Sequence, residues 1–247
     1  MPKSIAPLVS LRHPEMEAEP ALVISNRSEE IVVPLNREAS FYRRFPMLPL
    51  QERLSVVYVP SGGLDLHHAG KLWDRIALTD LEDDVMSSLR LVLPTAQGLC
   101  LVGVQSRVSG RYSGERIFVV RVSDLEKPVP LASMGEGAQR ILSLALALLS
   151  AQNGLLLIDE IENEVHYSAQ SQLWRFVFGV ARKSNVQVFA TTHSWDCVEA
   201  FGKVAIDCRN SMKSTLIRLE NREGVISGVE FSEEELDIVT TDRIEVR

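Results

Sequence analysis

The second half of the chain alternates helical patterns with short apolar runs. Leu155 to Ile158 are four aliphatic residues in succession, a pattern typical of a strand that is buried on both faces of a parallel sheet, with helices above and below it. Strands that alternate with helices in this way indicate βαβ units. The pattern predicts helices at residues 138–152, 168–183 and 195–201, and strands at residues 155–158, 186–191 and 203–207.

The first half of the chain and its C-terminal end favour antiparallel structure. Seven of the 11 prolines lie in the first fifty residues, which excludes long helices there. Residues 65–92 carry apolar side chains at helical spacing, and Ser232 and Glu235 have the spacing of a helix-capping box. The predicted strands are residues 21–25 paired with 30–33, then 54–59, then 102–105 paired with 116–122 across a turn at 110–114, and finally 215–220 paired with 225–231 across a turn at 221–224.

Two acids, Asp159 and Glu160, follow the predicted strand 155–158 directly. Open α/β sheets place their chemistry at the carboxyl ends of their strands. One carboxylate can hold a magnesium ion, and its neighbour can orient or deprotonate an attacking water. This division of roles suits phosphoryl transfer. The alternative is a strand that ends in two solvent-facing acids without a function.

Two further motifs flank the acidic pair. The segment Ser133–Gly137 places two glycines just before a long apolar helix, where free backbone N–H groups form a natural anion site. His193 follows the predicted strand 186–191. Asp159 lies 26 residues after Ser133, and His193 lies 34 residues after Asp159.

This order of motifs resembles the C-terminal half of an ATP-binding cassette (ABC) ATPase. It is most similar to the stand-alone bacterial group related to the OLD-type nucleases and to the ATPases of chromosome maintenance and double-strand-break repair. The resemblance covers about residues 130–200 well. It implies a P-loop NTPase-like α/β fold of the ABC type, in which a parallel sheet with flanking helices is joined by N-terminal and C-terminal antiparallel β elements.

The resemblance also implies a role for each matching residue. Asp159 is expected to bind Mg²⁺, Glu160 to orient the attacking water, and His193 to contact the γ-phosphate as the switch histidine. Ser133, Gly135, Glu136 and Gly137 form the expected signature loop, which contacts nucleotide in trans, and Glu162, Asn163 and His166 belong to the expected D-loop, residues 161–166, at a dimer contact. Two alternatives stay open: His166 as a surface residue that begins a helix, and His193 as a buried strand-end histidine bonded to a backbone carbonyl.

The implied cofactors are ATP and Mg²⁺, and the implied partners are a second copy in a head-to-tail dimer and an effector or nuclease in phage defence or DNA maintenance. A net charge of −7 argues against broad adhesion to nucleic acid, although Arg107, Arg111 and Arg116 are candidates for a local basic patch, as are Arg43 and Arg44. The residues Gln152-Asn153-Gly154 interrupt the most hydrophobic window, so no membrane span is expected. The cysteines, Cys100, Cys197 and Cys208, lack metal-ligand spacing and favour small core residues in a reducing, cytoplasmic location.

The phosphate-binding loop of this class, G-x-x-x-x-G-K-[ST] (the Walker A motif), is absent from the sequence. At the nearest candidate, six residues separate Gly63 from the pair Gly70-Lys71, and Leu72 stands where a hydroxyl should bind Mg²⁺. The chain is therefore either part of a longer ATPase or a degenerate, non-hydrolysing interaction module. An acid at Glu164 favours the second interpretation, whereas the retained Asp159–Glu160 pair opposes it because buried acids are costly to keep.

The domain organisation that we expect is a single ATPase-type domain over residues 1–247. Residues 1–130 form an irregular, antiparallel and helical lobe, residues 131–208 form the α/β core from signature loop to switch histidine, and residues 209–247 form a C-terminal hairpin and tail. A DNA-binding regulator is a weak third hypothesis, because no helix-turn-helix or basic helix is visible.

Overall fold

The computed structural model describes residues 4–5, 9–12, 21–25, 30–34, 55–108 and 111–241. The chain divides into two compact units. The larger unit is Arg53–Met212, and the smaller unit combines Met1–Glu52 with Lys213–Arg247. The larger unit contains every residue for which the sequence predicts a role in the site.

A parallel sheet in the order β10-β9-β5 forms the centre of the larger unit. Its strands are β5 (Val56–Val59), β9 (Leu155–Ile158) and β10 (Gln187–Ala190). β9 is the middle strand, and both neighbours run parallel to it. The predicted α/β architecture, a parallel sheet with flanking helices, is thereby confirmed.

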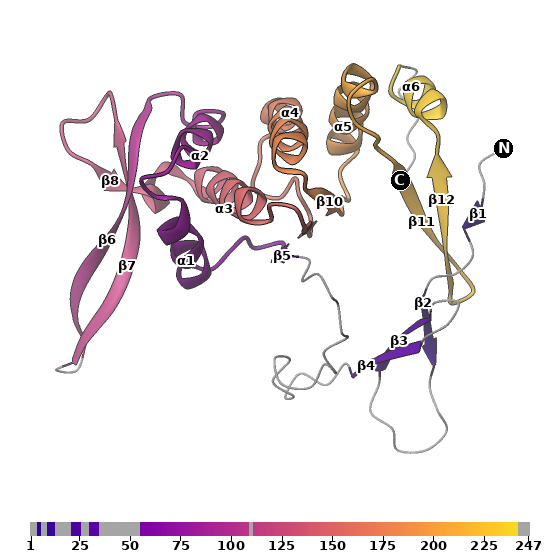
Figure 1. Cartoon of the computed structure of the whole chain (residues 1–247), viewed down its shortest axis with the longest axis horizontal. Coiled ribbons are helices and arrows are strands. Elements are labelled where there is room, and N and C mark those ends of the chain that lie inside the picture. Colours follow the sequence, from indigo (N-terminus) through magenta and orange to yellow (C-terminus); the bar gives the residue numbers. More distant parts are fainter. Residues whose placement is uncertain are drawn as a thin grey trace. The chain divides into compact units, whose positions relative to one another are not determined.

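The larger unit contains the helices α1 (Leu66–Ile76), α2 (Leu81–Leu89), α3 (Glu136–Ser150), α4 (Tyr167–Ser184) and α5 (Trp195–Cys208). Helix α3 is central, because nearly every side chain from Ala138 to Leu149 is buried and because α1, α2, α4 and β5 all pack against it. Figure 1 shows α3, α4 and α5 on the same side of β5 and β10.

The expectation that strand β9 is buried on both faces is wrong. Leu156 and Ile158 are 0% and 3% exposed, facing the helices, whereas Leu155 and Leu157 are only half-buried. The neighbouring strands expose the same face further. Its side chains are uncovered because the described helices lie on the opposite side of the sheet.

The predicted break in the third helix is also wrong. The sequence predicts a helix at 195–201 and a strand at 203–207, but α5 runs without interruption from Trp195 to Cys208. The buried side chains of α5 recur at helical spacing on both sides of Gly202, and Phe201 packs edge-on against Trp174 of α4 with ring centroids 5.0 Å apart. Packing of the two helices therefore outweighs the low helix propensity of one glycine.

The predicted hairpin is confirmed with longer strands. β6 (Ala96–Val108) pairs with β7 (Arg111–Val122), and β8 (Val129–Pro130) pairs with β7 on its other side. The turn predicted at residues 110–114 is wrong for 111–114, which belong to β7, and Gly110 lies outside the described residues. A backbone ladder can continue through polar residues and glycine, because its hydrogen bonds do not depend on side chains.

The smaller unit contains the two antiparallel pairs that the sequence predicts, 21–25 with 30–33 and 215–220 with 225–231, and two short strands, β1 and β2, that it does not predict. In one sheet, β1 (Ser4–Ile5) and β11 (Leu216–Arg222) flank β12 (Val225–Phe231); in the other, β2 (Val9–Arg12) and β4 (Glu30–Pro34) flank β3 (Ala21–Ser25). Helix α6 (Glu233–Thr241) begins at the predicted capping box, where the Ser232 N–H donates to Glu235 Oε2 at 2.9 Å and the Glu235 N–H donates to Ser232 Oγ at 3.2 Å. Within the described residues, no helix is long and apolar enough to cross a membrane.

The cysteines differ in their surroundings. Cys197 is fully buried, as expected of a small core residue, and burial raises the pKa of its thiol to about 11. Cys208 is half-buried, and Cys100 on β6 is exposed.

Gly154 should be essential for the stability of this sheet. It lies between α3 and β9, where a Cβ atom would overlap the carbonyl oxygen of Ser55 and lie 2.9 Å from its carbonyl carbon. We expect Gly154→Ala to lower the free energy of unfolding in urea by about 3 kcal/mol, because backbone must move to admit the methyl group. Gly179→Ala is the matched control: it lies inside α4 with open space around it and should stabilise the protein by about 0.5–1 kcal/mol. Equal stability of the two variants would contradict this account.

Candidate functional site

Asp159 lies at the carboxyl end of β9, one position after its last residue. Side chains alternate between the two faces of a strand, so Asp159 continues the uncovered face of the sheet that Leu155 and Leu157 begin. Thr191 holds the same position after β10, and its Oγ1 donates a hydrogen bond to Asp159 Oδ1 at 2.7 Å. The uncovered apolar face therefore ends in a carboxylate that a hydroxyl group holds in place.

Glu160 makes a sharp turn of the backbone next to Asp159. Its φ of 46° is left-handed, which is uncommon for a residue other than glycine. Its N–H donates to Thr191 Oγ1 at 2.9 Å, so one threonine hydroxyl holds both members of the acidic pair. Within the part of the chain that the structure describes, no hydrogen bond or ion pair engages the carboxylate of Glu160.

The guanidinium of Arg140 connects α3 to the carboxyl edge of the sheet. Its Nη1 donates to the Pro60 carbonyl at 2.7 Å, and its Nη2 donates to the carbonyls of Asp159 and Glu160 at 2.8 and 2.7 Å. The side chain is 1% exposed. One buried cation thus fixes the ends of two strands.

The charge of Arg140 is balanced by acids around it. Burial lowers the pKa of its guanidinium, and the negative charges of four nearby acids, Glu164, Glu162, Asp159 and Glu160, oppose that shift. Because an arginine begins with a pKa far above neutrality, it keeps its proton. All four acids belong to the segment that directly follows β9.

The segment 161–166 links three parts of the site. The Asn163 side chain donates to the Ser61 carbonyl at 3.0 Å, after β5. Glu162 Oε1 accepts a bond from the His193 N–H at 2.9 Å, and the second oxygen of Glu162 is buried without a partner. At Glu164 the φ is 63°, and the carbonyl of this residue lies against Gly137. A Cβ on Gly137 would approach it to 2.9 Å.

The segment 133–137 runs from a short 3₁₀ helix into the first turn of α3. Ser133 lies in the short 3₁₀ helix η1 (Leu131–Met134), where its hydroxyl donates to the Pro130 carbonyl at 2.6 Å. Gly135, with a φ of 97°, precedes the helix, and no side chain caps it. The first N–H groups of α3 are therefore available to an anion. The acid Glu136 in this first turn competes with such an anion.

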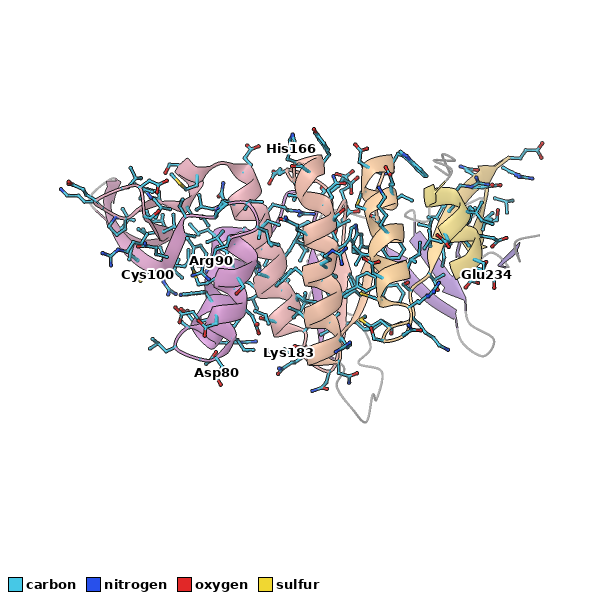
Figure 2. The ribbon with its side chains drawn as sticks, turned by 90° about the horizontal axis from the view of Figure 1, so that it is seen from above. Asp80, Arg90, Cys100, His166, Lys183 and Glu234 are labelled. Atoms are coloured by element: carbon cyan, nitrogen blue, oxygen red, sulfur yellow. The ribbon has the colours of Figure 1, made fainter. Side chains whose placement is uncertain are left out.

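The two histidines of interest are both exposed. His166 is the N-cap of α4: its Nδ1 accepts a bond from the Ser168 N–H at 3.4 Å, and its ring packs on Tyr167 with centroids 4.2 Å apart. Figure 2 shows it at the opposite end of α4 from Lys183. His166 is thus a surface residue that begins a helix. A role for it across a dimer stays a prediction. His193 is not a buried histidine, and no described residue bonds its imidazole.

The structure brings together Asp159, Glu160 and the backbone of His193 by way of Glu162, and it places Gly137 against the segment 161–166. Among the described residues no hydrogen bond joins Ser133 to the acidic pair, and its hydroxyl is bonded to the Pro130 carbonyl. Sequence reasoning assigned no role to two residues that organise the site, Arg140 and Thr191. Arg140 is the single charged residue between Ala138 and Leu149, which is the signal that could have found it. For Thr191 the signal is its position: it directly follows the strand β10, as Asp159 directly follows β9.

Arg140 should contribute strongly to stability. We expect Arg140→Met to lower the free energy of unfolding by about 3 kcal/mol, because it leaves three carbonyls without their charged donor. Arg140→Lys should recover only part of this loss, since one ammonium cannot reproduce the planar fork. Arg175, an exposed arginine paired with Asp207 at 2.7 Å, provides the control, and Arg175→Met should cost under about 1 kcal/mol. Urea denaturation of the four proteins measures this, and similar losses for Arg140→Met and Arg175→Met would refute it.

The comparison with protein families gives one match to most of the chain. The family model described as "AAA domain, putative AbiEii toxin, Type IV TA system" matches residues 2–196. A protein of Helicobacter pylori named ATP/GTP phosphatase is 31% identical over 88 residues, which are 34% of this chain and 24% of that protein. An uncharacterized protein of Methanocaldococcus jannaschii is 31% identical over 115 residues, which are 46% of this chain and 99% of that protein. The chain spans about a quarter of the length of the first relative and nearly all of the second.

Two solved structures of SMC proteins are weakly similar. One, described with ATP-driven dimerization and DNA-stimulated activation of SMC ATPases, has a TM-score of 0.46 and 12% identity, and covers 72% of this chain and 99% of that chain. The SMC head domain of Thermotoga maritima has a TM-score of 0.41 and 14% identity, and covers 86% of this chain and 73% of that chain. These scores are low, and the assignment does not depend on them. Because the family model spans residues 2–196 and so includes the whole parallel sheet and the acidic pair, the chain belongs to this AAA-domain family of P-loop ATPases.

Proposed function

We propose that this chain supplies the metal-binding and catalytic part of an ATPase of the ABC type, similar to the OLD-like group, which cleaves ATP to ADP and phosphate. The observation that carries the proposal is the Asp159 carboxylate, held by Thr191 at the carboxyl end of β9 and next to Glu160. Such an edge is where open α/β sheets bind their ligands.

Magnesium fits the donors at this edge. Proteins bind Mg²⁺ through one or two carboxylates together with substrate phosphates and water, rather than by a cage of protein ligands. Among the described residues, no group of three His, Cys, Asp or Glu side chains is arranged to hold a metal by itself. Asp159 has one oxygen, Oδ2, that accepts no bond from a described residue. The ion, when bound, supplies positive charge to the phosphates of the nucleotide.

Glu160 and His193 are suited to the remaining steps. The Glu160 carboxylate adjoins Asp159 and has no described partner, so it can orient a water and accept its proton. The imidazole of His193 is exposed, while its backbone is fixed by Glu162 at 2.9 Å. A fixed backbone and a free ring suit a histidine that contacts the γ-phosphate.

The segment Ser133–Gly137 would act in trans, in a head-to-tail homodimer. Two observations support this. No side chain caps the start of α3, and among the described residues the Ser133 hydroxyl bonds the Pro130 carbonyl and neither member of the acidic pair. Phosphate of a nucleotide on the partner would accept bonds from these N–H groups, while Glu162 and Asn163 hold the adjoining segment and exposed His166 faces the dimer. The same resemblance suggests work in phage defence or DNA maintenance beside an effector or nuclease.

A second candidate function is a non-hydrolysing interaction module of the same fold. The observations that favour it are the acid Glu136 in the first turn of α3 and the absence of a G-x-x-x-x-G-K-[ST] sequence. Without the lysine and amide cradle, the chain alone should hold nucleotide weakly. Nucleotide binding separates the two candidates when a P-loop-bearing polypeptide is present.

The charge of Asp159 should determine the magnesium dependence of nucleotide binding. Asp159→Asn keeps an oxygen that can accept the Thr191 bond but removes the negative charge. We expect the affinity for ATP in the presence of Mg²⁺ to fall at least ~tenfold, to the value without Mg²⁺. Calorimetric titration of ATP, with and without Mg²⁺ and with a P-loop-bearing polypeptide, measures this. Asp196→Asn, an exposed acid in the first turn of α5, is the control. If no preparation binds ATP, the interaction module is the better account.

Glu160 should be required for hydrolysis and not for binding. We expect Glu160→Gln to lower turnover of ATP at least ~100-fold, the usual contribution of a general base, with ATP affinity retained. The assay follows phosphate release by the preparation that hydrolyses ATP. Glu234→Gln in α6 of the smaller unit serves as the matched control. Unchanged turnover in Glu160→Gln would remove this residue from the mechanism.

A further inference from the structure

Two segments meet at the carboxyl edge of the parallel sheet, one directly after β9 and the other directly after β10. Four hydrogen bonds join them. Thr191 takes part in three: its hydroxyl bonds both members of the acidic pair, and its carbonyl accepts from the Ile161 N–H at 3.1 Å. The fourth bond runs from the His193 N–H to Glu162 Oε1 at 2.9 Å. It is the one bond of the four that reaches the histidine of the site.

The carboxylate of Glu162 is occupied within its own chain. One oxygen accepts the His193 bond, and the other is buried and has no hydrogen-bond partner among the described residues. Burial raises the pKa of the Cys197 thiol, and the negative charge of Glu162 adds to that rise. The carboxylate therefore lies close to Cys197, a fully buried residue of α5. These surroundings favour a role inside the chain over a contact with a second copy.

The bond to Glu162 determines how firmly the ring of His193 is placed. The imidazole is exposed and no described residue bonds it, so its position depends on its backbone. A hydrogen bond to a charged acceptor is about twice as strong as a neutral one. A displacement of about 1 Å in a reacting group can cost ~100-fold in rate. A contact with the γ-phosphate that strengthens in the transition state affects turnover more than the affinity for ATP.

We propose that Glu162 is a positioning residue for His193, and that its carboxylate holds the His193 backbone so that the imidazole reaches the γ-phosphate during hydrolysis. The catalytic consequence rests on the proposed ATPase function, whereas the bond can be tested without nucleotide. Glu162 acts here in cis and through another residue, and it does not touch the substrate.

Hydrogen exchange of the full chain, followed by NMR, tests the bond. Glu162→Leu and the smaller Glu162→Ala both lack an acceptor, and in both we expect the His193 amide proton to exchange at least ~tenfold faster. Glu162→Gln keeps an acceptor oxygen, so exchange at His193 should stay within ~threefold of the unchanged chain.

Glu82 provides the matched control, because its Oε2 accepts the Leu78 N–H at 2.8 Å in the turn between α1 and α2. Glu82→Leu removes the same kind of bond far along the chain from the site. It should speed exchange at Leu78 and leave exchange at His193 unchanged.

Turnover tests the catalytic consequence, in the preparation that hydrolyses ATP. Glu162→Leu should lower kcat ~tenfold to ~100-fold with ATP affinity retained, and Glu162→Gln should recover most of that loss. A double-mutant cycle identifies the route: if Glu162 acts through His193, adding Glu162→Leu to His193→Ala should lower kcat no further. The midpoint of urea unfolding checks that each variant keeps its fold.

Unchanged exchange at His193 in Glu162→Leu and Glu162→Ala would overturn the proposal. Independent losses of kcat in the double variant would do the same, as would a loss in Glu162→Gln equal to that in Glu162→Leu. Faster exchange at His193, with no ATP hydrolysis by any preparation, would reject the ATPase function alone. Hydrolysis that depends on Glu160 and His193 but not on Glu162 would reject the positioning role alone.

Discussion

The buried guanidinium of Arg140 is the contact on which the geometry of the site depends. The chain turns back from the sheet after both β5 and β9, and each turn leaves carbonyl groups at a buried edge that must find donors. A single side chain from α3 supplies those donors at 2.7–2.8 Å. It also offsets the repulsion among the acids that follow β9. The left-handed turn at Glu160, and with it the separation of the two carboxylates, persists because α3 is fixed to the sheet in this way.

Much of the larger unit follows from short-range patterns. The bounds of β9 agree with its run of four aliphatic residues, and α3 and α4 agree with their apolar periodicity within about two residues. The clustering of Asp159, Glu160 and the backbone of His193 is also visible in advance, because the carboxyl ends of parallel neighbours meet at one edge. These features depend only on local sequence and on one general rule about sheets.

The remaining features depend on contacts between residues far apart in the chain. Arg140 bonds a residue 80 positions away, and no local pattern reports such a partner. The continuity of α5 through Gly202 comes from packing against α4, which outweighs propensity. An aliphatic run such as β9 looks the same whether one or two faces of its strand are covered, so the uncovered face is visible only once the helices are placed. The sequence predicts Ser133 in a loop, whereas in the structure it lies in a 3₁₀ helix and its hydroxyl donates to the Pro130 carbonyl.

The close approach of Gly137 to the Glu164 carbonyl has a mechanical consequence. A Cβ atom on residue 137 would lie 2.9 Å from the Glu164 carbonyl oxygen. The two backbone segments are therefore close together, and no side chain of residue 137 lies between them. A displacement of the backbone at the start of α3 therefore moves the turn before α4 directly. A molecule that binds at the start of α3 and displaces it therefore also displaces the turn before α4. The two segments can lie this close because residue 137 is a glycine and has no Cβ atom.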